Sequence, residues 1–321
     1  MNAKNRSAHL AVVWLASLGA LSASGCSNNF RPASLVNHAR VLGARIEVLG
    51  DPTRSNPRPG ESATVRWLVG FPAEEQTLSW AFLTCVPEAT SYGVPQCAHA
   101  VGAPAVQLEP ALGAPHVELA IPNEATLGDA NQLLMLGSIC AQDQVNTDPT
   151  VQAACANPDG DGTIVTLRVP IERDGMTNHN PSLDAVTLND EVLDYMAAPD
   201  APGTGCAGGD APQIVWSEDV VALALTAVDG SRETYTVNRG APPVATDVLE
   251  DLLVEDLSTA GEIDLHFAYF DDLNPTIDLE WTLPALAEVA ADGTLVRLTF
   301  TMRDGRGGFD FIQRAVCVVA P

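Results

Sequence analysis

Hydrophobic and polar residues alternate with a period of two over most of the chain. Ala44, Ile46 and Val48 alternate with Arg45 and Glu47, as expected for a strand whose successive side chains point to opposite faces of a sheet. The alternation recurs at residues 63–69, 78–82, 117–121, 133–139, 165–171, 186–188, 221–225, 263–270, 277–281, 296–302 and 311–319. Short strands with little helical period between them predict an all-β fold of antiparallel sandwiches.

Turn residues indicate how some of these strands connect. Pro59-Gly60-Glu61 separates the first two strands, and the segment 304–308, Asp-Gly-Arg-Gly-Gly, predicts a terminal hairpin. Val228-Asp229-Gly230-Ser231 is typical of a hairpin turn before the strand that contains Tyr235 and Val237. Residues 246–257 fit either a short acidic helix or a strand followed by a turn, and the pattern leaves both open.

The chain is long enough for two domains of ordinary size. Residues 174–181, Asp-Gly-Met-Thr-Asn-His-Asn-Pro, interrupt the strand pattern with loop-forming residues. We therefore expect a first β-sandwich over 40–173, a linker at 174–181 and a second β-sandwich over 182–321.

The N-terminus predicts export and lipid attachment. Lys4 and Arg6 precede an apolar stretch from 10 to 21, which is shorter than the roughly 20 residues of a membrane-spanning helix. The run Leu21-Ser22-Ala23-Ser24-Gly25-Cys26 resembles a lipobox, with Ala23 where Leu is preferred. We expect a lipoprotein signal at 1–25, lipidation of Cys26 and a tether over 26–39; an ordinary cleavable signal peptide is the alternative. Ser27 in place of Asp after Cys26 resembles lipoproteins anchored in the outer membrane, facing the periplasm or the cell surface.

The cysteine count agrees with an exported protein. Of the seven cysteines, assigning Cys26 to lipid leaves six, an even number that could all form disulfides. Many pairings are possible, and adjacency along the chain suggests Cys85 with Cys97, Cys140 with Cys155, and Cys206 with Cys317.

The charge is strongly acidic. The full chain carries 16 basic and 41 acidic residues, and removal of Lys4 and Arg6 with the signal leaves 14 against 41, a net charge of −27. Such a surface repels phosphate backbones, which excludes nucleic acid as a partner. It could attract cations such as Ca²⁺, or it could simply keep the protein in solution.

Two acidic loops are the candidates for a cation site. Asn157, Asp159 and Asp161 supply oxygen atoms at alternate positions with intervening glycines, and Asp271 and Asp272 form a second cluster. The first loop departs from an EF-hand because Arg168 occupies the twelfth position. An irregular calcium loop and a plain Asp/Gly turn both remain open. We expect no other cofactor.

No catalytic motif is present. The sequence has no Walker A motif, no H-E-x-x-H and no nucleophile elbow, so we expect a protein that is not an enzyme. Trp67 and Trp80 lie on apolar strand faces, where core packing is expected, whereas Trp216 and Tyr92 are candidates for ligand contact. Tyr92 falls inside the expected Cys85 to Cys97 loop.

Several short motifs resemble known modules. Pro59-Gly60-Glu61 before Val65-Arg66-Trp67 resembles the opening of bacterial immunoglobulin-like modules, while Glu280-Trp281-Thr282-Leu283-Pro284 and the glycine-rich segment 303–308 look like the closing strands of PKD-type modules. Together they resemble uncharacterised surface lipoproteins of Gram-negative bacteria.

This resemblance implies two immunoglobulin-like domains and a binding, adhesion or structural role in the cell envelope, with an envelope protein or a glycan as partner. The alternatives are a carbohydrate-binding or carbohydrate-degrading lipoprotein and a calcium-dependent binding module.

Overall fold

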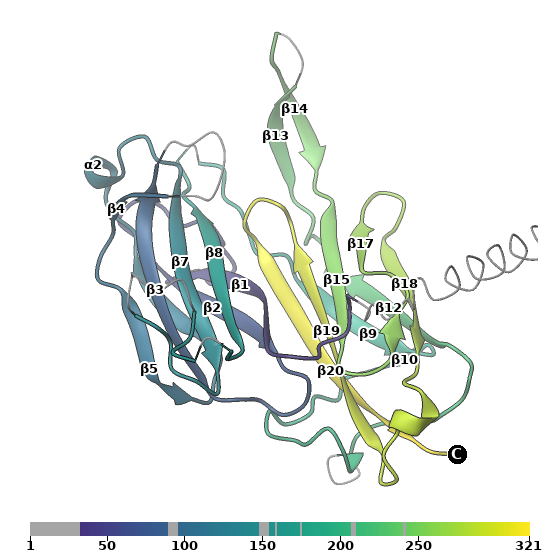
Figure 1. The fold of residues 1–321 in the computed structure, drawn as a ribbon. Helices are drawn as coiled ribbons and strands as arrows, with labels where there is room; N and C mark the ends of the chain where they lie inside the picture. The colour runs from purple at the N-terminus through teal and green to yellow at the C-terminus, as the bar shows by residue number, and fades with distance from the viewer. Residues whose placement is uncertain are drawn as a thin grey trace, which may run out of the picture. The chain divides into compact units, whose positions relative to one another are not determined.

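The computed structural model describes residues 33–88, 96–147, 154–157, 159–173, 175–206, 210–239 and 242–321. Strands make up nearly all of the regular structure in these ranges, with only the short helices α2 (Glu124–Leu127) and η2 (Leu286–Glu288) among them (Figure 1). The prediction of an all-β fold with antiparallel sheets is therefore confirmed. We call the described residues up to 173 the N-terminal half and those from 175 onward the C-terminal half.

The N-terminal half contains two antiparallel sheets. The first has the order β1-β2-β6. The second has the order β4-β3-β7-β8, with β5 also paired to β3. Their strands are β1 (Arg40–Val48), β2 (Ser62–Gly70), β3 (Leu78–Pro87), β4 (Cys97–Ala100), β5 (Ala105–Ala111), β6 (His116–Ala120), β7 (Gln132–Ala141) and β8 (Gly162–Pro170).

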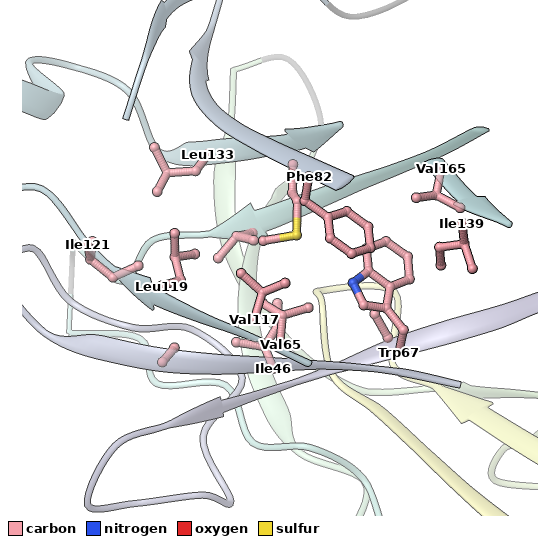
Figure 2. Packing of buried hydrophobic residues seen from close by; sticks show 14 of the residues in the cluster. Ile46, Val65, Trp67, Phe82, Val117, Leu119, Ile121, Leu133, Ile139 and Val165 are labelled. Atoms are coloured by element: carbon pink, nitrogen blue, oxygen red, sulfur yellow. The ribbon is translucent and has the colours of Figure 1, made fainter. Parts of the chain in front are cut away.

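The core of this half is enclosed by inward-facing residues from both sheets. Ile46 and Val65 come from the first sheet and Phe82 from the second, and they belong to one buried apolar cluster. Trp67 lies in the same cluster, with its indole stacked on the Phe82 ring at a centroid distance of 5.2 Å (Figure 2). In strands such as β1 and β6, the alternation seen in the sequence thus becomes one buried and one more exposed face.

The C-terminal half contains two further sheets and a separate strand pair. The sheets have the orders β10-β9-β12-β18-β16 and β11-β20-β19-β15-β17, and β13 pairs only with β14. All pairs are antiparallel except β11 with β20. The strands are β9 (Leu183–Leu188), β10 (Glu191–Val192), β11 (Gln213–Val215), β12 (Val221–Ala227), β13 (Thr234–Arg239), β14 (Val244–Leu249), β15 (Leu252–Ser258), β16 (Glu262–Ile263), β17 (Phe267–Phe270), β18 (Thr276–Thr282), β19 (Thr294–Arg303) and β20 (Phe309–Val319).

A second large apolar cluster fills the C-terminal half. Leu223 and Trp281 from one sheet pack with Leu298 and Val316 from the other, and each of these side chains is at most 2% exposed. The two main clusters draw their residues from either side of 174–181. The segment expected to separate two domains therefore separates two cores.

The connections show where the turn residues predicted the strand pairing correctly and where they did not. The terminal hairpin is confirmed, because β19 and β20 pair along their length across the turn at 304–308. The hairpin expected at Val228 to Ser231 is wrong: the turn forms, but β12 pairs with β9 and β18 while β13 pairs with β14. Residues 246–257, left open by the sequence, lie in β14 and β15 rather than in a helix.

The segment just before β1 is packed rather than free. Val36 is 4% exposed, and its amide donates to the Ser258 carbonyl at 2.8 Å. The Ser258 amide in turn donates to the Ser34 carbonyl at 2.8 Å. The part of the expected tether that the structure describes, from residue 33, is therefore held against β15.

Candidate functional site

Two asparagines of the connector, residues 178 and 180, are buried and hydrogen-bonded to both halves. Asn178 is 2% exposed, and its Nδ2 donates to Asp304 Oδ2 at 2.6 Å and to Ser55 Oγ at 2.7 Å. Asn180 is 8% exposed; its Nδ2 donates to the Ile46 carbonyl at 2.7 Å, and its Oδ1 accepts from the Phe309 amide at 3.0 Å. Hydrogen bonds between buried groups are costly to break, so these asparagines fix the connector to both halves.

A small apolar cluster joins the halves beside the connector. Leu42 and Leu68 from the N-terminal half pack with Leu257 and Phe309 from the C-terminal half. Gly43 permits this approach, because a Cβ atom there would lie 2.3 Å from Phe309 Cε2. An ion pair between Arg45 and Asp310 crosses the same junction.

A cleft of about 360 Å³ opens next to this cluster. One wall comes from β2 and the segment after it, and the other comes from β19, β20 and the loop that precedes β11. Its lining residues are Val36, Trp67, Leu68, Val69, Gly70, Phe71, Ala73, Glu75, Ala114, Met196, Ala197, Pro199, Thr259, Arg297, Thr299, Phe311, Gln313 and Arg314. Most of these side chains are apolar, and the volume lies within the range of small-molecule sites.

The strand register explains which side chains reach the cleft. Arg297 pairs with Ala315 and Thr299 with Gln313, so the four residues share one face of the β19-β20 pair. The opposite face carries Leu298, which is fully buried in the core. Arg297 and Gln313 therefore point away from the core of their own half.

Arg297 is the cationic side chain of this wall. Its Nη2 donates to the carbonyl oxygens of Ala198 at 3.3 Å and Ala201 at 2.5 Å. Its Nη1 is buried and has no hydrogen-bond partner among the described residues. Desolvation lowers the pKa of Arg297, and the nearby charge of Glu74 opposes that shift. Glu75 adds a carboxylate to the cleft lining and accepts from the Gly113 amide at 2.8 Å.

Arg314 also borders the cleft, but its guanidinium is engaged elsewhere. It pairs with Leu298 in the register, which places its side chain on the opposite face from Arg297. There its Nε donates to the Leu193 carbonyl at 2.6 Å and its Nη1 to the Gln313 carbonyl at 2.8 Å. Desolvation lowers the pKa of Arg314 as well.

The six cysteines form the three disulfides that adjacency along the chain suggests. They join Cys85 to Cys97, Cys140 to Cys155, and Cys206 to Cys317, with Cα atoms 5.5, 5.7 and 5.3 Å apart. The first two lie within the N-terminal half and the third within the C-terminal half. They brace loops and strand ends and do not border the cleft.

In the first candidate calcium loop, Asn157 and the backbone are hydrogen-bonded within the chain. Asn157 Oδ1 accepts from the Asp159 amide at 3.1 Å, and the Asn157 amide donates to Asp143 Oδ2 at 2.9 Å. The carbonyl of Asp161 accepts from the Ala141 amide at 2.9 Å. These bonds describe a turn that leads into β8.

In the second acidic loop, both candidate calcium ligands are bonded to other groups of the chain. Asp271 Oδ1 accepts from the Leu273 amide at 2.7 Å, the Asn274 amide at 2.8 Å and Asn274 Nδ2 at 2.9 Å. These bonds, the Leu273 amide first, lower the pKa of Asp271. Asp272 pairs with Arg232 at 3.0 Å. Over the described ranges, no group of three or more His, Cys, Asp or Glu side chains could hold a metal ion.

The two aromatic ligand candidates have different outcomes. Tyr92, like Cys26, lies outside the described residues. Trp216 is partly buried against the core of the C-terminal half, and its indole N–H donates to the Pro284 carbonyl at 2.8 Å. Trp216 therefore packs within its own half.

Two features were not anticipated. The first is a pair of exposed aromatic side chains on the edge strand β17, Phe267 at 60% and Tyr269 at 45% exposure, with ring centroids 6.3 Å apart. Their alternate spacing in the sequence could have indicated one strand face, but not that the face is exposed. The second is the cleft, whose walls come from segments more than 200 positions apart.

In the part of the chain that the structure describes, no helix has the length and apolar character needed to cross a bilayer.

No protein-family model matches the chain, and no curated protein matches it. Among solved structures, the chain is similar to Escherichia coli alpha-2-macroglobulin activated by porcine elastase, with 11% sequence identity and a TM-score of 0.21. The match covers 88% of this chain and 22% of that protein, so the chain spans about a fifth of that protein's length.

Proposed function

We propose that this protein is a lipid-anchored, non-enzymatic binding protein of the cell envelope, built from two immunoglobulin-like β-sandwich domains. The signal-like N-terminus that ends at Cys26 supports the anchor, and three disulfides support an extracytoplasmic location. The absence of Asp after Cys26 supports the outer membrane as its site.

The cleft between the two halves is the observation that carries the binding role. It is concave and mostly apolar, with a few polar groups from Arg297, Gln313 and Glu75. Sites of this kind take small molecules and often lie where two structural units meet. Because Asn178 and Asn180 fix the connector to both halves, the walls are held in place before a ligand arrives, which reduces the entropy lost on binding.

A neutral apolar probe tests the cleft as a binding site. Phenylbutanol is titrated into the full exported chain held in nanodiscs, with empty nanodiscs as the blank, and heat of binding is measured by calorimetry. Ala114 is exposed and lines the cleft, so Ala114→Trp should abolish binding by filling it. Ala245 is exposed on β14, away from the cleft, and Ala245→Trp is the control. Absence of binding to the unmodified chain, or equal loss in both variants, would refute the proposal.

Mass spectrometry of the mature N-terminus tests the anchor. A diacyl or triacyl Cys26 is expected, and Cys26→Ser should release the protein from the membrane fraction. An unmodified N-terminus at another position would remove the anchor from the proposal without affecting the cleft.

Carbohydrate binding is a second candidate, favoured by the exposed aromatic pair on β17. Aromatic rings at a surface can stack on sugar rings, and Phe267 and Tyr269 are both accessible. A panel of oligosaccharides titrated against the full chain should then show binding that is lost in Phe267→Ala and Tyr269→Ala but kept in Ala114→Trp. If the aromatic variants bind as well as the unmodified chain, this second function is excluded.

A further inference from the structure

The arginines of this protein are, for the most part, neutralised by the acidic residues around them. Among the described residues, eight make ion pairs with carboxylates: Arg45, Arg54, Arg58, Arg66, Arg173, Arg232, Arg303 and Arg306. Arg297 is not among them; the only hydrogen bonds of its guanidinium within the described ranges go to the carbonyl oxygens of Ala198 and Ala201. Among the described arginines that make no ion pair, Arg297 is distinguished by a buried guanidinium nitrogen, Nη1, without a hydrogen-bond partner.

The environment of Arg297 disfavours a charge that stays unpaired. Its Nη1 is buried without a hydrogen-bond partner among the described residues, and such a donor carries a desolvation penalty until something accepts from it. The apolar side chains around the cleft lower the local dielectric, which strengthens attraction to an opposite charge. A charged guanidinium N–H also makes a stronger hydrogen bond to a carboxylate than a neutral donor does.

Two glutamates limit this attraction without removing it. Glu75 lines the cleft, yet it makes no ion pair with Arg297 and its Oε1 accepts from the Gly113 amide. Glu74 is exposed and acts on Arg297 only through its charge. The wall thus offers an anion the guanidinium of Arg297, together with one carboxylate that weakens its binding.

We propose that the cleft binds a small organic anion, with a carboxylate at Arg297 and an apolar body against the side chains of Leu68 and Phe311. The proposal rests on the cleft being the binding site and adds the chemical class of the ligand. Such a ligand would accept a hydrogen bond from Arg297 and cover the part of Phe311 that is otherwise open to water.

Three probes of the same shape but different charge test the assignment. Phenylbutyrate, phenylbutanol and phenylbutylamine are titrated into the full exported chain in nanodiscs. Phenylbutyrate should bind at least about tenfold more tightly than phenylbutanol, because hydrogen bonds to charged groups contribute more than neutral ones. Phenylbutylamine should bind most weakly.

Two variants with opposite expected effects on phenylbutyrate binding test whether Arg297 causes the preference for the acid. Arg297→Gln should reduce the preference for the acid over the alcohol to nearly none. Glu75→Gln keeps an oxygen that can accept from Gly113 and should strengthen binding of phenylbutyrate alone. Arg239→Gln is the control, since this arginine is exposed on β13 and does not line the cleft. It should leave the preference unchanged.

The outcomes separate the two proposals. If none of the three probes binds, the cleft is not the site and both proposals fail. If acid and alcohol bind equally well, or if Arg297→Gln and Glu75→Gln both leave their ratio unchanged, the anion assignment fails and the cleft remains. Because Glu75→Gln leaves the hydrogen bonds of Arg297 intact, it keeps the test decisive even if Arg297→Gln disturbs the loop at 198–201.

Discussion

Asp256 is a buried carboxyl group whose ionisation should make the stability of the protein depend on pH. It is 3% exposed and lies on the same face of β15 as Leu252 and Val254, which are part of the core. Its Oδ2 has no hydrogen-bond partner among the described residues. Burial, followed by repulsion from Asp264 and Glu255, raises the pKa of Asp256 from 3.8 to about 7.

The sign of the effect follows from the proton count in each state. Below pH 3.8 the carboxyl group is protonated in both the folded and the unfolded chain, and its contribution to stability is fully present. Between pH 3.8 and about 7 the unfolded chain has lost the proton while the folded chain retains it, so stability falls as the pH rises. Above about pH 7 both states are ionised and the loss is complete.

The difference between a pKa of about 7 and one of 3.8 sets the size of the effect. At about 1.36 kcal/mol per pKa unit, the full loss is about 4 kcal/mol. Asp256→Asn preserves the size of the side chain but cannot ionise. We therefore expect the variant to be more stable than the unmodified chain at pH 8 by up to this amount, and similar to it at pH 4.

Urea unfolding at a series of pH values from 4 to 8.5 measures this difference. Trp281 is fully buried in the same half and contributes a fluorescence signal that reports on its unfolding. Other acidic groups also titrate, but they do so in both proteins, so the difference between the two curves isolates Asp256. Asp278→Asn, an exposed change on β18, is the control and should follow the unmodified chain. A constant difference between Asp256→Asn and the unmodified chain over this range would falsify the reasoning.

Three further results are expected. Gly43→Ala should destabilise the protein by about 1–3 kcal/mol, because the new methyl group overlaps the Phe309 ring. Adding Phe309→Leu to this variant should restore part of the lost thermal stability. An unchanged melting temperature for Gly43→Ala would contradict this contact. Glu172→Gln removes the buried carboxylate shared by Arg54 and Arg58 and leaves Arg54 only its pair with Glu61, so it should cost about 1.5–3 kcal/mol by urea unfolding. Glu124→Gln at an exposed pair should cost less than about 1 kcal/mol. Addition of Ca²⁺ should not change the melting temperature of the protein, since Asp271 already accepts three hydrogen bonds. A rise in melting temperature that EGTA reverses would show that the protein does bind calcium.

Several strands could be predicted because they keep a buried and an exposed face. In β18, for example, Ile277, Leu279 and Trp281 are buried and the residues between them are exposed, as the sequence pattern indicates. Which strands pair with each other was harder to predict from the sequence. The turn at 228–231 has the chemistry of a hairpin, yet β12 lies between β9 and β18, because Leu223 and Leu225 pack there against the core. Turn residues specify local geometry, whereas the choice of partner depends on distant strands.

The cleft could not be predicted for a related reason. In the sequence, Arg297 is an ordinary polar residue between two apolar residues of a strand, the same pattern that gives solvent-exposed side chains elsewhere. Its burial results from the loop at 198–201 and from the segment after β2, both of which are brought to it by tertiary packing. That Arg297 makes no ion pair with a carboxylate also depends on the folded structure, so the sequence could not show it.

The connector shows that the hydrogen-bonding capacity of asparagine, which favours loops, can also fix a loop in place. Asparagine favours loops because its side chain competes for backbone hydrogen bonds, and for that reason 174–181 was predicted as a linker. In the structure, the Asn178 and Asn180 side chains use this capacity to bond to both halves. If these bonds hold the cleft walls in place, Asn178→Ala should weaken phenylbutyrate binding without touching the cleft, while Asn238→Ala, on exposed β13, should not. Calorimetry that shows equal affinity for the two variants would mean that the walls keep their positions without the connector.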